Sequence, residues 1–245
     1  EILHYLYQYR FLTTTHLQKL LTHKNPNRTL SWLNNLINKN CVHRLYDPKT
    51  FAENNKPAIY YLAPKARHIL SQEKDIPLLE LDYIYSEHRR EEKFIAHSLL
   101  VADISLFLQN QTAPGETLQI FMKNQLRGYE YFPDPRPDAF IAVKDSGSTK
   151  RYFLDVFDDF TPTFVIRQRV RNYLAYFEHS DWDENTDHAL FPSILFVCPN
   201  KRTKKHILLY SKAVLDKNLD NILTLFVTAK EEISNKSQEI WEKVS

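Results

Sequence analysis

Residues 28–39 read RTLSWLNNLINK and divide into two faces when wound as a helix. Leu30, Leu33, Leu36 and Ile37 form one apolar stripe at the spacing of a helix packed on a core. The opposite face combines cations, amides and a hydroxyl with no acid, namely Arg28, Ser31, Asn34, Asn35, Asn38 and Lys39. Because such groups bond base edges and phosphates, the pattern predicts a helix that contacts DNA.

The segments around this helix predict a winged helix-turn-helix. Residues 2–9 have helical apolar spacing, and Thr13 and Thr14 are natural N-caps for a second helix. Two β-rich runs, residues 41–46 and 58–62, predict a hairpin that a further helix follows. Helices and hairpin in this order are typical of a fold whose third helix enters the major groove.

The hairpin loop supplies the predicted wing, which touches the DNA backbone in this fold. The expected DNA contacts outside the third helix are Thr14, Arg44, Lys49 and Lys56. Residues 1–72 contain ten lysines or arginines and three acids, a net charge of +7 in a chain whose total is +2. A basic segment of this kind favours a polyanionic partner. The alternative is a winged helix that binds protein, because the fold is reused in that way.

The rest of the chain predicts a linker and an α/β domain. Residues 73–85 contain Pro77 among alternating acids and are expected to be the linker. Over residues 86–245 the apolar period gives the order helix, three strands, helix, strand, helix, strand, helix. This order predicts a mixed sheet with helices on both faces. The polar stretch 181–187 is expected to be a loop.

Two carboxylates are the candidate catalytic and metal-binding residues. Asp138 follows Pro137 at the head of the second predicted strand, and Asp155 lies within the third. A hairpin would bring the two acids to one end of the sheet, where carboxylate oxygens can hold Mg²⁺ and activate water against a phosphodiester. In the alternative, Asp138 caps the entrance of its strand and Asp155 pairs with an arginine of the following helix.

The αβββαβ order with Pro-Asp opening the second strand resembles the PD-(D/E)XK nuclease core, a restriction-endonuclease-like fold. The resemblance implies that Asp138 and Asp155 occupy the positions of the metal-binding acids. The lysine of that motif is replaced by Phe157, whose ring can neither position water nor balance charge. The domain is therefore expected to be degenerate, with no cofactor, and to use Mg²⁺ only if it cleaves.

The whole chain also resembles the replication-relaxation proteins of plasmids and other mobile elements. Short motifs in a characteristic order give the resemblance: YRFLT at 9–13, RTL at 28–30, VHRL at 42–45, PAIYYL at 57–62, His97, RPDAF at 136–140, YFLD at 152–155, Arg169, Tyr173, Tyr176 and LFV at 195–197. It implies a winged-helix DNA binder joined to a nuclease-like domain and linked to replication or its control. That family usually has Glu at the position of Asp155 and a further acid at the position of Phe157.

Several classes of protein and site are excluded by composition. The three glycines lie too far apart for a phosphate-binding loop, which argues against a Walker ATPase, a kinase and a Rossmann dehydrogenase. Two cysteines, Cys41 and Cys198, are too few for a disulfide scaffold or a four-cysteine zinc site. The chain has no apolar run of membrane-spanning length and begins at Glu1 without a signal segment, so a cytoplasmic protein without membrane contact is expected.

Three functions stay open at this point. The first is a sequence-specific duplex DNA-binding protein of a plasmid or mobile element, acting in replication or transcription control with an inactive nuclease-like domain. The second is a Mg²⁺-dependent endonuclease that the winged helix guides to its nicking or cleavage site. The third is a protein-binding adaptor. The expected partners are double-stranded DNA, a second copy of the chain in a homodimer, and replication or transfer proteins.

Overall fold

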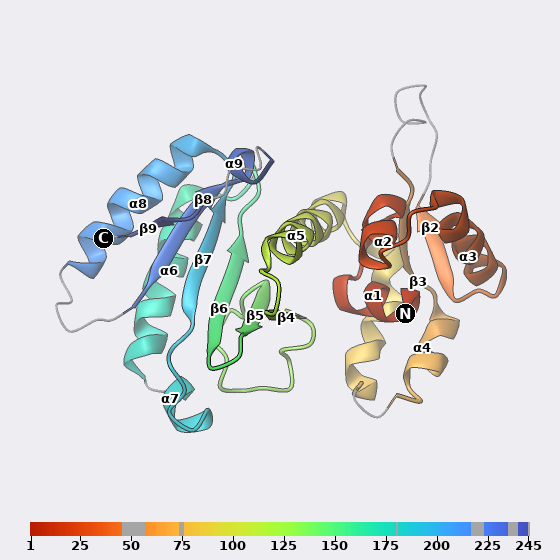
Figure 1. Cartoon of the computed structure of the whole chain (residues 1–245), viewed down its shortest axis with the longest axis horizontal. Coiled ribbons are helices and arrows are strands. Elements are labelled where there is room, and N and C mark those ends of the chain that lie inside the picture. The colour runs from red at the N-terminus through yellow and green to blue at the C-terminus, as the bar shows by residue number, and fades with distance from the viewer. Residues whose placement is uncertain (46–56, 74–75, 180, 217–222, 235–239, 245) are drawn as a thin grey trace. The chain divides into compact units, whose positions relative to one another are not determined.

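The structure, a computed structural model, describes residues 1–45, 57–73, 76–179, 181–216, 223–234 and 240–244. They form two compact units, Glu1–Asn110 and Gln111–Ser245, which are called unit 1 and unit 2 below (Figure 1). The predicted wing contacts Lys49 and Lys56 lie outside the described residues. None of the helices in the described part is long and apolar enough to cross a membrane.

Unit 1 begins with three short helices that pack around a small sheet. The elements are α1 (Ile2–Tyr9), β1 (Leu12–Thr13), α2 (Thr14–Leu20), α3 (Pro26–Asn38), β2 (Val42–Leu45), β3 (Ile59–Leu62) and α4 (Pro64–Leu70). The strands lie in the order β1-β3-β2 and are all antiparallel to their neighbours. The predicted helices and strand pair are present, and β1 is a strand that the sequence pattern missed.

The ends of α2 and α3 have local side-chain caps. The Thr13 hydroxyl accepts from the backbone N of His16 at 3.1 Å, and the His16 ring accepts from the backbone N of Thr13, a reciprocal capping box. Thr13 is therefore the N-cap, and Thr14 is the first residue of α2. At α3 the Asn25 side chain is the N-cap and accepts from the backbone N of Asn27 at 3.0 Å, with Pro26 at the first helical position.

The buried side of α3 differs slightly from the predicted stripe. Leu33 is fully buried and Leu36 and Ile37 are half-buried, as expected, but the side chain of Leu30 is 38% exposed. Thr29 is fully buried instead. Thr29 and Leu33 lie one turn apart, and they form the centre of the face that packs on α2 and β2. Leu30 lies at the edge of that face.

The predicted linker at residues 73–85 is wrong for most of its length. Leu78–Arg89 forms a 3-10 helix, η2, that contacts α4 and β3, with Leu81 and Ile84 buried. Its Tyr83 hydroxyl donates to the backbone oxygen of Tyr7 at 3.0 Å. The alternating acids suggested solvent exposure, yet Tyr83 is buried and so is one of the acids, Glu80. Together with α5 (Glu92–Gln111), η2 extends unit 1 to Asn110, well past the expected boundary at residue 72.

Unit 2 has the mixed sheet that the sequence predicted. Its strands are β4 (Thr117–Met122), β5 (Ala139–Lys144), β6 (Thr149–Val156), β7 (Ser193–Cys198), β8 (Leu225–Ala229) and β9 (Glu242–Lys243), in that spatial order. Pairing is antiparallel from β4 to β6, parallel from β6 to β8, and antiparallel between β8 and β9. A continuous apolar run, SILFVC, forms the central strand β7, as expected for a strand buried on both faces.

The helices of unit 2 are α6 (Thr163–Glu178), α7 (Asp181–Asn185), α8 (Lys201–Leu215) and α9 (Lys230–Ser234). The expected loop at 181–187 is wrong in part, because the buried Trp182 anchors α7 in the core through the aromatic rings of Phe132 and Phe153. A single core joins α6 and α8 to one face of the sheet, with Phe196 and Ile207 fully buried within it.

One edge of this sheet collects the elements of the candidate site. The strands β6 and β7 are parallel and lead into α6 and α8, so both helices begin at the same edge of the sheet. Asp138 directly precedes β5, and β5 is antiparallel to β6. Asp138 and Asp155 therefore lie at this edge as well, where the pattern of strands had predicted them to meet.

Candidate functional site

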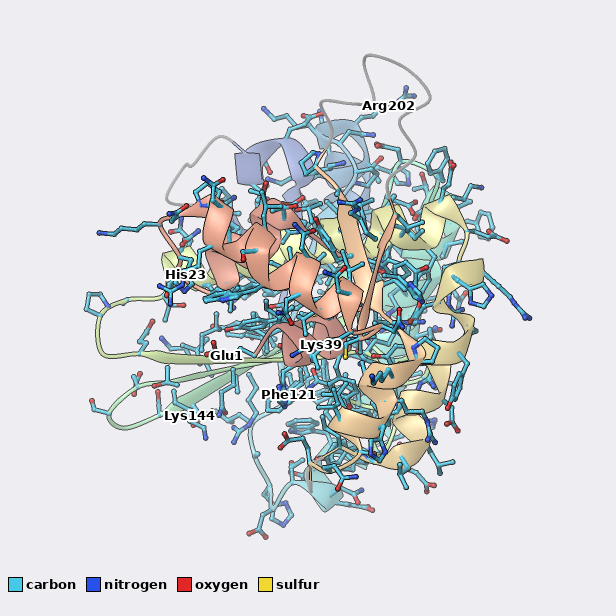
Figure 2. The ribbon with its side chains drawn as sticks, turned by 90° about the vertical axis from the view of Figure 1, so that its right-hand side faces the viewer. Glu1, His23, Lys39, Phe121, Lys144 and Arg202 are labelled. Atoms are coloured by element: carbon cyan, nitrogen blue, oxygen red, sulfur yellow. The ribbon has the colours of Figure 1, made fainter. Side chains whose placement is uncertain are left out.

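The outer face of α3 is open to solvent as the sequence predicted. All six expected contact residues are exposed: Arg28, Ser31, Asn34, Asn35, Asn38 and Lys39. Figure 2 looks onto the side of unit 1 that contains α3, with His23 labelled just before the helix and Lys39 at its end. Among the described residues, no carboxylate forms an ion pair with Arg28 or Lys39. The face therefore presents uncompensated positive charge and amide groups.

Arg28 is held in place on this face by stacking. Its guanidinium lies 5.0 Å from the centre of the Trp32 ring, and Trp32 meets the His23 ring edge-on at 4.7 Å between ring centroids. A stacked guanidinium keeps its hydrogen-bond donors free at its edges. The arrangement can therefore present Arg28 to a base edge or a phosphate with little loss of side-chain freedom.

The remaining predicted contacts in the described part have different surroundings. Arg44 is exposed on β2, opposite Tyr60 in the antiparallel register. Thr14 is half-buried, and its backbone N donates to the backbone oxygen of Ala58 at 3.3 Å. Thr14 therefore joins the start of α2 to β3 through its main chain, and its hydroxyl is less accessible than the α3 groups.

In the carboxylate pair of unit 2, the oxygens of Asp155 are occupied by hydrogen bonds, chiefly from an arginine. The Asp155 side chain is only 9% exposed and receives two bonds from Arg169, Nε to Oδ2 at 2.8 Å and Nη2 to Oδ1 at 3.2 Å. The Tyr173 hydroxyl donates to the same Oδ2 at 2.7 Å. Asp138 accepts at its Oδ2 from the backbone N of Val156 at 2.9 Å. The alternative drawn from the sequence, in which Asp155 pairs with a helix arginine, is confirmed.

Arg169 is fixed on every side within this buried cluster. Its guanidinium lies 4.4 Å from the Tyr173 ring centre, and it also donates to the Tyr173 hydroxyl and to the backbone oxygen of Pro135. Burial lowers the pKa of Arg169, but the carboxylates of Asp155 and Asp138 more than offset this effect, so the pKa is raised and Arg169 stays charged.

The Asp155 carboxyl responds to two opposing influences. Burial raises its pKa, and the nearby Asp138 adds to this effect, whereas the charge and hydrogen bonds of Arg169 act in the other direction. Burial of the Tyr173 hydroxyl and the same Asp155 carboxylate raise the pKa of Tyr173 well above its ordinary value. Tyr173 therefore remains a protonated donor to Asp155.

These residues do not fit a Mg²⁺ site. Both oxygens of Asp155 are bonded to Arg169 or Tyr173, whereas Mg²⁺ needs carboxylate oxygens that are free to coordinate. Phe157, at the position of the motif lysine, is buried against Phe196 with 5.1 Å between ring centroids. In the part of the chain that the structure describes, no group of three or more His, Cys, Asp or Glu residues could hold a metal ion.

The sequence profile of the replication-relaxation family matches residues 3–194. The chain belongs to this family. The match includes α3 and the whole Asp138–Asp155–Arg169 cluster, and it confirms the resemblance found in the short motifs. In this member of the replication-relaxation family, the motif residues Arg169 and Tyr173 serve to hold Asp155.

Other comparisons add little to the family assignment. A search of curated proteins finds no match. Among solved structures, two of the restriction endonuclease FokI are similar at 14% sequence identity, with TM-scores of 0.36 for one and 0.33 for the other, which is bound to DNA. These alignments cover 94% of this chain and 41% and 42% of FokI, so the chain spans about two fifths of that enzyme. A likeness this distant assigns neither activity nor partner.

Proposed function

We propose that this replication-relaxation family member binds a specific duplex DNA site through unit 1 and acts in replication or transcription control of a plasmid or mobile element. Residues 1–72 form a winged helix-turn-helix in this proposal, with α3 in the major groove. The observation that supports it most is the exposed face of α3, with Arg28, Asn34 and Asn35 on it and no ion pair to a described carboxylate at Arg28.

The chemistry of that face is suited to reading sequence. Arginine bonds the two acceptors of guanine, and asparagine bonds the acceptor and donor of adenine in the major groove. Asn34 and Asn35 follow Arg28 by about two turns, so their side chains reach different base pairs from the one that Arg28 contacts. In this proposal Arg44, Lys49 and Lys56 contact the DNA backbone. Paired half-sites would bring a second copy of the chain to the DNA, alongside replication or transfer proteins.

Selection from a random duplex library tests this proposal. The full chain is expected to enrich one defined site and to bind it about 10³-fold or more tightly than random duplex at the same salt concentration. Gel shifts at physiological salt then compare the selected and the scrambled sequence. Equal affinity for both sequences would instead favour the adaptor function.

Unit 2 is proposed to be a nuclease-like domain that does not cleave. The closed Asp155–Arg169 pair and the buried Phe157 support this, because a phosphodiester cleavage site needs open carboxylates and a positioned cation. Supercoiled plasmid containing the selected site is therefore expected to stay intact with Mg²⁺ or Mn²⁺. The Asp138→Ala and Asp155→Ala proteins are controls that should look the same on the gel. Nicking by the unchanged protein that both substitutions abolish would restore the endonuclease function.

A further inference from the structure

A second basic surface lies in unit 2, where α6 and α8 begin. The first turns of α6 and α8 enclose a hollow of about 530 Å³. Four basic side chains line it: Arg167 from α6, and Arg202, Lys205 and His206 from α8. Among the described residues around the hollow, no aspartate or glutamate contributes to the lining. The hollow is therefore a concave surface of one sign of charge.

The cations of the hollow are placed by the helices and by each other. Arg202 and Lys205 are exposed, so their charges face solvent. Arg167 donates to the Nε2 atom of His206, and its guanidinium lies 5.1 Å from the Tyr210 ring centre. Arg167 is thus held in position before any ligand arrives. The hollow also lies beside two helix N-termini, where partial positive charge favours an anion.

Two large apolar side chains share this surface with the cations. Phe164 is 70% exposed and Leu209 is 64% exposed, and both line the hollow. An exposed aromatic ring beside cations is the combination that stacks an unpaired base while its phosphates are neutralised. Inorganic phosphate has no planar group that could stack on the Phe164 ring, so the exposed ring favours a ligand that has a base.

Nearby acids do not cancel the charge. The sequence of α8 contains five lysines or arginines and no acid. Of these, Lys204 does not face the hollow's ligand, because it forms ion pairs with Glu232 at 2.9 Å and with Glu242 at 3.1 Å. Asp158, which precedes α6, does not line the hollow. The positive potential of the hollow is therefore available to a ligand.

We propose that this hollow binds an unpaired DNA segment, with phosphates at Arg167, Arg202 and Lys205 and one base stacked on Phe164. Duplex DNA fits the observation less well, because its bases are stacked within the helix and cannot cover Phe164. The site is separate from the duplex contact proposed for α3, and it stands on its own geometry. It gives unit 2 a nucleic-acid function that needs no cleavage.

Fluorescence anisotropy of the full chain with a labelled (dT) strand of about ten nucleotides, within the usual span of one single-strand site, tests the proposal. The charge-reversed protein Arg202→Glu/Lys205→Glu should bind the strand at least about tenfold more weakly, and its salt dependence should fall by ~0.7 for each phosphate that is no longer neutralised. Phe164→Ala removes the stacking surface and should weaken binding about fivefold or more without changing the salt slope. All three side chains are exposed on helices, so circular dichroism should show an unchanged fold.

The matched control is Lys144→Glu/Lys150→Glu, which changes the net charge equally on the β5–β6 hairpin. Figure 2 shows Lys144 and Arg202 at opposite ends of unit 2. This control should alter affinity for the (dT) strand by no more than about twofold, since the Debye length of about 10 Å limits its reach. An equal decrease in the control would overturn the proposal, because the binding would then reflect net charge alone.

Competition separates the possible ligands and the two proposals. Unlabelled (dT) should displace the labelled strand, whereas a hairpin-free duplex, thymidine monophosphate or inorganic phosphate at the same phosphate concentration should not. Displacement by duplex as effective as by (dT), or by phosphate alone, would overturn the unpaired-strand assignment. The Arg202→Glu/Lys205→Glu protein should still prefer the site selected in the duplex library. Proteins altered on α3 should still bind (dT), so either proposal can fail without the other.

Discussion

Replacing Arg28 with alanine is expected to weaken binding to the selected duplex about 5- to 150-fold, which corresponds to about 1–3 kcal/mol for one base contact. The cost arises because the base edge loses a partner with two hydrogen-bond donors. The Arg28 guanidinium is exposed and already stacked on Trp32, so it is placed for this contact before DNA binds. Asn34→Ala and Asn35→Ala should each cost a similar amount at their own base pairs. Gel shifts with the selected duplex and with single base-pair changes measure both effects.

The matched control for this series is Arg127→Ala, which removes an exposed arginine from unit 2. It should leave the preference for the selected site unchanged, whereas Arg28→Ala should relax that preference at one base pair. A protein with Arg28, Asn34 and Asn35 all changed to alanine should bind selected and random duplex equally. Unchanged selectivity in this triple variant at constant salt would remove α3 as the reading element.

Breaking the buried pair should have the largest effect on stability. Arg169→Ala leaves the Asp155 carboxylate without its cation in an almost fully buried site, so unit 2 should lose about 3–5 kcal/mol of unfolding free energy. Asp155→Ala should lower the unfolding free energy by a similar amount, since it leaves the Arg169 guanidinium buried without its carboxylate partner. Tyr173→Phe removes a single donor to Asp155 and should cost less, about 1–3 kcal/mol.

Urea unfolding followed by tryptophan fluorescence measures these decreases in stability. Trp32 lies in unit 1, and Trp182 and Trp241 belong to unit 2, so a Trp32→Phe background restricts the signal to unit 2. The double replacement Asp155→Leu/Arg169→Met should recover most of the stability, because a buried pair exchanged for apolar residues is often neutral. Mg²⁺ should leave the midpoint unchanged. A Mg²⁺-dependent rise that Asp155→Ala abolishes would show an open metal site instead of a closed ion pair.

How much the sequence predicted differs between the two candidate surfaces. The α3 face was predicted residue by residue, because a helix with a period of 3.6 residues assigns each side chain to a face from local spacing alone. Only Leu30 was placed wrongly: it was predicted in the buried stripe, but it lies at the edge of that stripe and is exposed. The acids of unit 2 were predicted to meet, and an arginine of the following helix was one alternative partner for Asp155, but the sequence did not say which arginine. No spacing rule identifies Arg169 as the partner, although its spacing of one turn from Tyr173 is a weak signal.

The sequence by itself determined most of the longer helices and strands, the mixed sheet of unit 2, the outward face of α3 and the family, because each depends on local periodicity or on short motifs. Only the tertiary structure decided that Leu78–Arg89 packs as η2, that Arg169 neutralises Asp155, and that Phe164 and Arg202 line one hollow. Each of these depends on contacts between residues far apart in the chain. At these positions another element of the fold decides whether a side chain is buried, paired or exposed. Local spacing in the sequence does not identify that element.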